Sequence, residues 1–289
     1  MPDRPFHPAL LAAGLVATAL AAVAVDAFVI EPRWVQVTHH ELPLPGLPAA
    51  WAGARIVHLT DLHYGNPHSQ SLFAWMVRTV NGLEPDLVVV TGDYVVERSA
   101  EIQACAFHLG QLSSRHGVVG VLGDHDYTGR AKGTPRRQLD GVVEALEAGG
   151  VHLLRDVGVE LAGGLRVAGT DPLTGRLQAG SLEQTLERMP EPHLLLSHSP
   201  EIIVAASRRD LPMVLCGHTH GGQVVIPFYG PPLTYIKLPR RYASGWSSMG
   251  STRMYTCRGL STHKSVRFCC RPEIAVFRLV ASPRKEGVR

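Results

Sequence analysis

Five short apolar stretches, each followed within three residues by aspartate or histidine, constrain the fold of this 289-residue chain. Stretches of this kind predict strands that are buried on both faces, as in a parallel sheet. Ligands of open α/β sheets collect at the carboxyl ends of the strands. Five strand ends that carry acidic and imidazole side chains therefore predict one shared site. The stretches are residues 55–59, 86–90, 118–122, 193–196 and 212–216.

The side chains that follow these stretches have the composition of a metal site. A single aspartate or histidine near a turn is usually a cap or a solvated group, but that explanation fits five clusters at once poorly. Mixed imidazole and carboxylate ligands suit Mn²⁺, Fe or Zn²⁺, whereas Mg²⁺ and Ca²⁺ prefer shells of oxygen alone. The predicted ligands are Asp61, His63, Asp93, Asp124, His198, His218 and His220.

The spacing of the clusters predicts an α/β fold. Asp61 and Asp93 are 32 residues apart, and Asp93 and Asp124 are 31 apart. A strand–helix–strand unit has about that length, roughly 30 residues. Helix-like stretches at residues 71–83 and 100–114 fill the two intervals, and we expect them to be right-handed crossovers between parallel strands.

The order of the motifs resembles the signature of the calcineurin-like metallophosphoesterases. In this chain it runs Asp-x-His, Gly-Asp, Gly-Asp-His-Asp, His and Gly-His-x-His, and the likeness extends over residues 55–278. Residues 30–40, 258–260 and 271–274 more specifically resemble the bacterial membrane-associated YaeI/YkuE-type phosphodiesterases. The resemblance implies a four-layer αββα sandwich with a dinuclear metal site.

Carried over residue by residue, the resemblance implies two groups of ligands. One metal ion would be bound by Asp61, His63 and His220, and the other by Asp124, His198 and His218, with Asp93 bridging the two. Two ions roughly 3.5–4 Å apart can share a hydroxide, aim it at phosphorus and stabilise the attacking and leaving oxygens. His125 would donate a proton to the leaving group. Mn²⁺ is the first expectation for both divalent ions, with Fe and Zn²⁺ as alternatives.

Two positions depart from the family pattern. Asp124 stands where the family usually has asparagine. Three ionised aspartates would leave two divalent cations with a charge of about +1 before hydroxide binds, which favours monoanionic diesters or diphosphates over a phosphate dianion. Asp93 is followed by Tyr-Val-Val-Glu-Arg, whereas the resembled protein phosphatases have Val-Asp-Arg-Gly. We therefore do not expect a phosphoprotein phosphatase.

The N-terminal region predicts a membrane-spanning helix. Residues 9–25 carry no charge, and the apolar run resumes after Asp26 as far as Ile30, which reaches the roughly 20 residues that a bilayer requires. A cleaved signal peptide, with Ala-Val-Ala at 22–24 as its cleavage site, is one alternative. A buried helix of a soluble protein is another. We favour an uncleaved anchor because a strand is predicted close behind it, at residues 34–40.

This interpretation divides the chain into an anchor, residues 1–30, and a calcineurin-like phosphoesterase domain, residues 31–289. It places the protein at the cell membrane on a single N-terminal helix. Arg4 and Arg33 balance each other across that helix, so the side of the membrane is not specified.

Composition narrows the range of partners. The net charge is only +3 and the pI is about 8.7, so bulk charge does not indicate a nucleic-acid partner. The five cysteines are an odd number without zinc-site spacing, which mildly favours a reducing compartment, and a disulfide of Cys257 with Cys269 or Cys270 is the alternative. No feature of the sequence indicates a protein partner.

Two predicted loops are candidates for substrate selection. Residues 127–137 follow His125 and could grip a second phosphate, although a solvated basic loop is an equal alternative. The cations of this loop are Arg130, Lys132, Arg136 and Arg137. Residues 226–246 mix aromatic side chains with cations, which suits a membrane interface or an acyl-chain groove. A packed hairpin over the site is the alternative for this second loop.

The sequence thus predicts a membrane-anchored phosphohydrolase that cleaves a phosphodiester or diphosphate bond. The anchor, the aromatic loop and the resemblance indicate a phosphorylated, lipid-linked small substrate. Some members of the resembled group cleave UDP-2,3-diacylglucosamine in lipid A biosynthesis, so that compound is the first specific expectation. A broad-specificity phosphodiesterase acting on nucleotides or cell-envelope polymers is one alternative. A metal-binding pseudoenzyme, inactivated by Asp124, is the alternative of another class.

Overall fold

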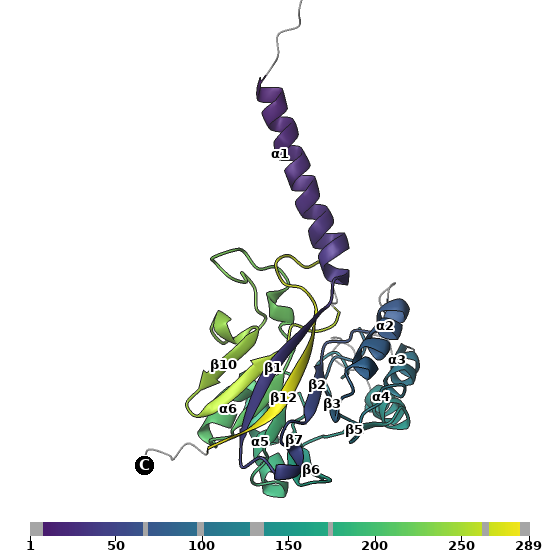
Figure 1. The fold of residues 1–289 in the computed structure, drawn as a ribbon, viewed down its shortest axis with the longest axis vertical. Coiled ribbons are helices and arrows are strands. Elements are labelled where there is room, and N and C mark those ends of the chain that lie inside the picture. Colours follow the sequence, from purple (N-terminus) through teal and green to yellow (C-terminus); the bar gives the residue numbers. More distant parts are fainter. Residues whose placement is uncertain are drawn as a thin grey trace, which may run out of the picture.

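In a computed structural model of the protein, two six-stranded sheets pack face to face (Figure 1). The structure describes residues 8–65, 69–96, 101–127, 136–172, 176–261 and 266–283. The first sheet contains, in spatial order, β1 (Gln36–Pro45), β12 (Glu273–Ser282), β2 (Arg55–Leu59), β3 (Leu87–Thr91), β4 (Val118–Val121) and β5 (Val151–Leu153). The second contains β10 (Gly245–Met249), β11 (Thr252–Thr256), β9 (Met213–Cys216), β8 (Leu194–Leu196), β7 (Leu165–Gly169) and β6 (Val157–Leu161).

Apolar side chains form three buried layers between and outside the sheets. Successive residues of a strand point to opposite faces, so Val89 of β3 packs between the sheets with Leu194 and Leu215. Its neighbours Val88 and Val90 pack on the outer face. The helices outside the first sheet are α2 (Ser69–Gly82), α3 (Ile102–Leu109) and α4 (Arg136–Ala148), and those outside the second are α5 (Arg176–Arg188) and α6 (Ile203–Arg208). The predicted four-layer αββα sandwich is confirmed.

The strands that precede the predicted ligands are parallel within each sheet. β2, β3 and β4 pair in parallel, with α2 and α3 between them in the chain, and β8 and β9 pair in parallel in the second sheet. The carboxyl ends of parallel neighbours lie at one edge of a sheet, which is where the ligands follow. α3 is shorter than the predicted 100–114, because the chain turns at Gly110, directly after the last helical residue Leu109.

The two ends of the chain pair with each other at the edge of the first sheet. β1 runs parallel to β12, with Gln36 opposite Glu273. β12 is antiparallel to β2, with Ala275 opposite His58. β1 therefore begins at the same edge of the sheet at which β2, β3 and β4 end.

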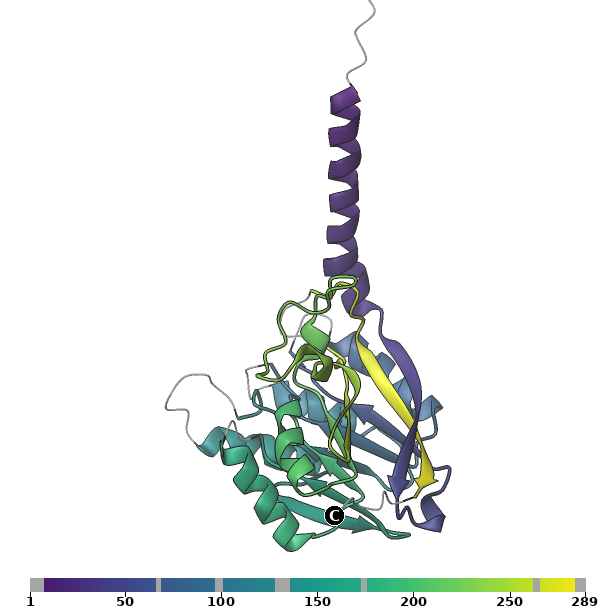
Figure 2. The same ribbon diagram turned by 90° about the vertical axis from the view of Figure 1, so that its left-hand side faces the viewer.

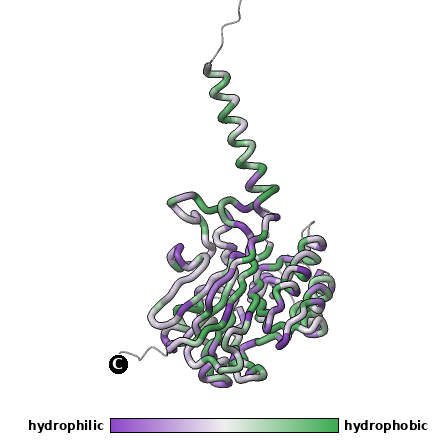
Figure 3. The backbone as a smooth tube through the Cα atoms, viewed as in Figure 1, coloured by the Kyte–Doolittle hydropathy of each residue, from purple (hydrophilic) through white to green (hydrophobic). Residues whose placement is uncertain are grey.

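A helix precedes β1 and extends away from the sheets (Figures 1 and 2). It comprises α1 (Pro8–Val25), a π-helical turn (Asp26–Ile30) and a 3₁₀ turn (Glu31–Arg33). Its candidate span, Leu11–Arg33, has 23 residues, and the most apolar 18-residue window within it has a mean hydropathy of 2.2 and is 6% buried. Hydrophobic residues line most of its length (Figure 3). The low burial argues against a buried soluble helix, whereas a membrane span and a signal sequence both fit.

Candidate metal centre

The seven predicted ligands lie just beyond the carboxyl ends of five strands. β2, β3 and β4 of the first sheet are followed by Asp61 and His63, by Asp93, and by Asp124, respectively. β8 and β9 of the second sheet are followed by His198 and by His218 and His220. The edges of both sheets thus contribute to one cluster of side chains.

The backbone bends sharply at these strand ends. Five of the seven candidate ligands have a positive φ: Asp61 (51°), His63 (43°), Asp93 (56°), His218 (71°) and His220 (51°). Residues other than glycine rarely adopt this left-handed conformation, which costs on the order of 1–3 kcal/mol per residue and clusters at functional sites. The fold therefore accepts strain at the positions that aim imidazole and carboxylate groups at one another.

The glycines before the ligands are required by close packing. A Cβ atom at Gly123 would overlap the carboxylate and backbone of Asp93, and one at Gly217 would overlap Thr60 and Asp61. Glycine therefore allows neighbouring strand ends to approach closely. This explains why the Gly-Asp and Gly-His motifs begin with glycine.

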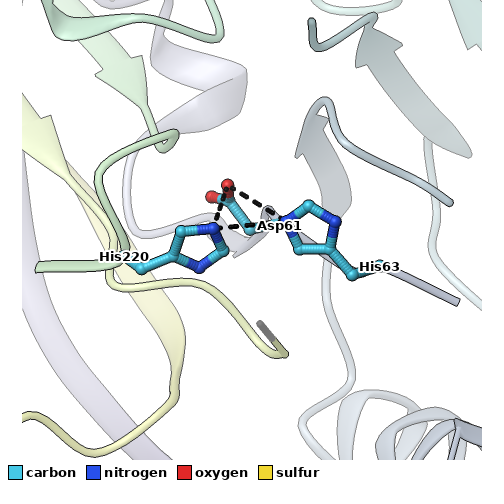
Figure 4. A group of neighbouring side chains, drawn as sticks. All are labelled: Asp61, His63 and His220. Atoms are coloured by element: carbon cyan, nitrogen blue, oxygen red, sulfur yellow. Dashed lines mark hydrogen bonds and ion pairs between the residues drawn. The ribbon is translucent and has the colours of Figure 1, made fainter. Parts of the chain in front are cut away.

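The first group of ligands comprises Asp61, His63 and His220 (Figure 4). The Nε2 atoms of His63 and His220 are 3.2 Å apart, and Oδ1 of Asp61 lies 3.5 Å from Nε2 of His220. Atoms that bind one ion at about 2.0–2.2 Å are separated by about 3–3.5 Å, which these two distances match. The third pair, Nε2 of His63 and Oδ1 of Asp61, is farther apart at 4.0 Å. Oδ1 of Asp61 is buried and accepts no hydrogen bond among the described residues. A cation would satisfy this acceptor.

The second group comprises Asp124, His198 and His218. Nε2 of His198 lies 3.1 Å from Oδ1 of Asp124 and 3.1 Å from Nδ1 of His218. Nδ1 of His218 is 3.0 Å from the same carboxylate oxygen. This triangle has the spacing of three ligands of one ion. The Asp124 side chain is 38% exposed, so the second group is open to solvent, whereas Asp61 and His63 are fully buried.

Asp93 lies between the two groups. Its Oδ2 atom is 3.6 Å from Nε2 of His63, in the first group, and 3.4 Å from Nε2 of His198, in the second. Its Oδ1 atom accepts a hydrogen bond from the backbone N–H of His125 at 2.9 Å. This placement is the one that a bridging carboxylate requires.

Two of the imidazoles are oriented by backbone carbonyls. Nδ1 of His198 lies 2.7 Å from the carbonyl oxygen of Thr91, and Nδ1 of His220 lies 3.1 Å from that of Ser261. A carbonyl only accepts, so Nδ1 carries the proton in both rings. Nε2 is then the ligating nitrogen, which is the usual outer arrangement of metal-bound histidine.

The electrostatics of the cluster favour a bound cation. Burial raises the pKa of Asp61 to about 6. Burial also acts to raise the pKa of Asp93, but the charge and hydrogen bond of His198 outweigh it and hold the pKa well below its usual range. Burial and the neighbouring His63 lower the pKa of His220, which keeps this ring in its neutral, ligating form. A divalent cation would also stabilise the ionised form of Asp61.

His125 lies beside the first group. It belongs neither to the two groups nor to the third set of converging ligand atoms, which comprises Asp61, Asp93 and His198. Its ring is 5.0 Å from the ring of His63, nearly perpendicular to it, and its Nδ1 donates to the carbonyl of Val96 at 2.9 Å. Burial lowers the pKa of His125, but the charge of Asp93 and the Val96 carbonyl outweigh burial and raise it overall. The Val96 carbonyl thus fixes Nδ1 as the nitrogen that carries the proton in the neutral ring.

The cationic loop predicted to bind a second phosphate falls largely outside the described residues. Arg130 and Lys132 lie outside the described residues. Arg136 and Arg137 begin α4, and only the backbone of these two residues is described. The contribution of these cations stays a prediction.

One residue that the sequence analysis left without a role is Asp126. Its buried carboxylate accepts hydrogen bonds from the N–H groups of Gly123 (2.7 Å), Tyr94 (2.8 Å) and Asp93 (2.9 Å). Burial and the charge of Asp93 raise its pKa to about 7. Asp126 thus holds the turns after β3 and β4 together, and the second aspartate of Gly-Asp-His-Asp was its only sequence signal.

Arg267 and Glu31 were also missed. Arg267 is fully buried and donates to the backbone carbonyls of His220 (3.0 Å), Arg258 (2.8 Å) and Ser261 (3.0 Å). The carboxylate of Glu31 accepts from the N–H groups of the neighbouring residues Cys269 and Cys270. These contacts fix the segment around Arg267 that supports His220. No local pattern in the sequence predicts them.

Comparison with known proteins agrees with this geometry. Residues 54–222 match the calcineurin-like phosphoesterase family. The chain is 31% identical to the metallophosphoesterase YkuE of Bacillus subtilis, over 86% of this chain and 87% of that protein. It is 31% identical to the phosphodiesterase YaeI of Escherichia coli, over 86% and 90%.

A third relative has a named substrate. The UDP-2,3-diacylglucosamine pyrophosphatase LpxG of Chlamydia trachomatis is 25% identical, over 88% of this chain and 92% of that protein. Both the family match and the two relatives at 31% identity cover most of the region that carries the ligand clusters. The chain therefore belongs to the calcineurin-like phosphoesterases and is a metallophosphoesterase.

Proposed function

We propose that the protein hydrolyses a phosphodiester or diphosphate bond in a lipid-linked substrate at a membrane surface. The observation that carries this proposal is the arrangement of the two ligand groups with Asp93 between them. They lie at the edge of the first sheet at which β1, the strand after the N-terminal helix, begins. The two sites would hold divalent ions, Mn²⁺ as the first choice and Fe or Zn²⁺ as alternatives, because nitrogen and oxygen ligands are mixed.

Each side chain has a separate task in this proposal. Asp61, His63 and His220 would hold one ion, and Asp124, His198 and His218 the other, with Asp93 shared. When bound, such a pair supplies a hydroxide nucleophile and neutralises charge on the phosphoryl oxygens. His125 would give the proton on Nε2 to the leaving oxygen. Asp126 and Arg267 hold the turns that aim the ligands.

The substrate proposal rests on relatives and on the helix. LpxG, named for UDP-2,3-diacylglucosamine, supports a lipid-linked diphosphate, and UDP-2,3-diacylglucosamine is the first specific candidate. YaeI, named a phosphodiesterase, supports the alternative of a broad phosphodiesterase. The open carboxylate of Asp124 adds negative charge where a phosphate would enter, which disfavours dianionic monoesters under either candidate.

The helix is proposed to be an uncleaved anchor, residues 1–30, preceding the phosphoesterase domain, residues 31–289. Its last turns pack on that domain, since the carbonyl of Ala27 accepts from the N–H of Arg267 at 2.9 Å. A signal peptide cut after residue 24 would leave these packed turns at a new N-terminus. Mass spectrometry of the protein from its native membrane distinguishes the two, because an anchor retains residues 1–24.

One assay tests the proposed activity. Purified protein loaded with Mn²⁺ is given bis-p-nitrophenyl phosphate, p-nitrophenyl phosphate and UDP-2,3-diacylglucosamine. Faster turnover of the acylated diphosphate supports the lipid-linked substrate. Preference for the soluble diester supports the broad phosphodiesterase. Stoichiometric metal without turnover of any of the three would contradict both and identify a metal-binding pseudoenzyme.

Asp124→Asn tests the charge of the site. The amide removes one negative charge and keeps an oxygen ligand, so we expect activity on p-nitrophenyl phosphate to rise relative to bis-p-nitrophenyl phosphate, because a dianion gains more from added positive charge than a monoanion. The measurement is the ratio of the two kcat/KM values. Asp210→Asn, an aspartate that accepts from Ser251 in an exposed turn, is the matched control. An unchanged or reversed ratio would refute the charge argument.

Truncation tests the anchor. Removing residues 1–25 should release a soluble domain that keeps its turnover of bis-p-nitrophenyl phosphate and cleaves bilayer-borne substrate more slowly, because the anchor raises the local concentration of enzyme at the surface. Removing residues 1–30 also deletes the Ala27 carbonyl that accepts from Arg267. A lost partner of a buried donor costs about 1–3 kcal/mol, so this shorter protein should melt several degrees lower. Loss of soluble-substrate turnover in the 26–289 protein would show that the anchor interpretation is wrong.

A further inference from the structure

A loop that follows the second sheet's ligands exposes a concentrated group of large apolar side chains. Among the described residues after Trp34, six large hydrophobic side chains are exposed, and five of them lie within residues 226–235, here called the apolar loop. These five are Ile226, Phe228, Tyr229, Leu233 and Tyr235, and the sixth is Phe107. Single exposed hydrophobics need no explanation, but a contiguous group marks a contact with a partner or a membrane.

The apolar loop is held in a fixed shape. Ile226 and Gly230 exchange backbone hydrogen bonds of 3.1 and 2.8 Å around a tight turn. Phe228, at the tip, has φ = 66°, a strained conformation for an aromatic residue, and is as exposed as in an extended peptide (112%). The guanidinium of Arg240 stacks on the ring of Tyr229 at 4.1 Å and donates to its hydroxyl at 2.7 Å. The strained backbone and these hydrogen bonds keep the Phe228 side chain exposed to water, which does not stabilise the isolated domain.

The apolar loop lies next to the base of the N-terminal helix. Phe268 donates to the carbonyl of Gln223 at 3.0 Å and accepts from the N–H of Val225 at 2.8 Å, at the root of the loop. The preceding residue, Arg267, donates to Ala27 in the last turns of the helix. One short segment thus joins the loop to the helix. Figures 1 and 2 both show the green loop at the end of the molecule from which α1 departs.

A second aromatic side chain lies where the helix meets the domain. Trp34 directly follows the candidate span Leu11–Arg33 and is more than half exposed. The guanidinium of Arg271 lies 3.8 Å from the centre of its ring, as Arg240 does on Tyr229. Tryptophan and tyrosine concentrate at the boundary of a bilayer, and arginine beside them can bind the phosphates of lipid head groups.

We propose that the apolar loop inserts into the head-group region of a phospholipid bilayer beside α1, with Phe228 at the deepest point. This proposal rests on the proposed function, because α1 must be in the membrane for the loop to reach it. An acyl-chain groove does not fit, since the Phe228 ring is fully exposed and lines nothing. The bilayer is favoured over a protein partner because an apolar helix of spanning length leaves from the same end.

Insertion of the loop would orient the metal centre. β1 begins at the edge where β2, β3 and β4 end, so the ligands face the end of the molecule that carries the helix. The Thr219–Gln223 turn connects the ligand His220 to the root of the apolar loop. A bilayer at this end would place the phosphate groups of its lipids next to the metal centre. The class of substrate is then an amphiphile whose scissile phosphate remains in its own membrane.

The test is depth-dependent fluorescence quenching of the full-length protein in phosphatidylcholine–phosphatidylglycerol vesicles with brominated acyl chains. Three variants each add one tryptophan: Phe228→Trp at the loop tip, Leu15→Trp in α1, and Phe107→Trp, the exposed aromatic of α3 outside the first sheet. The difference between each variant and the unmodified protein removes the signal of the four native tryptophans. We expect a blue-shifted, quenched signal at positions 15 and 228 and an unquenched signal at 107.

The three positions separate the two proposals. Quenching at 15 without quenching at 228 would overturn loop insertion and leave the anchor standing. No quenching at 15 would overturn the anchor, and loop insertion with it. Quenching at 107 equal to that at 228 would overturn loop insertion, since it would mean adsorption without orientation.

A kinetic comparison gives an independent readout. Burial of one phenylalanine side chain changes a partition equilibrium about 10- to 100-fold. Phe228→Ser should therefore lower the turnover of bilayer-borne substrate, relative to that of bis-p-nitrophenyl phosphate, by about 10-fold or more, and Phe107→Ser should leave this ratio unchanged. The same ratio in both variants would contradict the proposal.

Discussion

Asp93→Asn should abolish hydrolysis and deplete both metal ions together while the protein stays folded. The carboxylate stands 3.6 Å from a nitrogen of one ligand group and 3.4 Å from a nitrogen of the other, so its charge would act on both ions. Metal-ion catalysis contributes several kcal/mol, and its loss corresponds to about 10³-fold or more in turnover. The amide can still accept from the N–H of His125, which preserves the turn.

The measurement combines metal analysis with thermal unfolding and turnover of bis-p-nitrophenyl phosphate. His63→Ala removes a ligand of the first group alone and should mainly empty one position. Asp86→Asn is the matched control, because Asp86 immediately precedes β3, at the opposite end from Asp93, where it accepts from the N–H of Arg55 at 2.8 Å. Two ions per chain in Asp93→Asn would contradict the bridging assignment.

The strands and the positions of the candidate ligands at the strand ends were predictable because their signals are local. The apolar runs before Asp61, Asp93 and Asp124 mark buried parallel strands, and the structure places β2, β3 and β4 on them with shifts of one residue at most. The glycines before Asp93 and His218 allow neighbouring strand ends to approach closely, and these glycines are visible in the sequence itself. The resemblance then supplied the grouping of the candidate ligands, which stays a prediction, and the structure brings the same side chains together.

The order of the strands in the sheets and the residues that support the ligands could not be predicted, because they depend on contacts between distant parts of the chain. Which strands share a sheet follows from pairings such as that of β1 with β12, from opposite ends of the sequence. Arg267 supports His220 through hydrogen bonds to carbonyl oxygens, and any residue type supplies a carbonyl, so no motif marks them. The packing of Glu31 and Ala27 on the segment behind His220 was equally invisible, and it makes the end of the helix part of the folded domain.

His125→Ala is expected to lower the turnover of an alkyl diester by about 10²–10⁴-fold with unchanged metal content. The His125 ring belongs to none of the sets of converging ligand atoms, and its Nδ1 is held by the carbonyl of Val96, so Nε2 is the nitrogen that we propose to transfer the proton. Its backbone N–H, which binds Asp93, is retained in alanine. The loss should therefore be chemical and not structural.

The dependence on the leaving group decides whether His125 acts as an acid. A nitrophenolate departs without a proton, whereas an alkoxide needs one, so the loss in His125→Ala should be small for bis-p-nitrophenyl phosphate and large for an alkyl diester. Added imidazole should restore part of the alkyl-diester turnover. His152→Ala, which removes an exposed histidine of β5, should change neither rate. An equal loss for good and poor leaving groups, or a loss of metal, would show that His125 binds an ion or positions the phosphate.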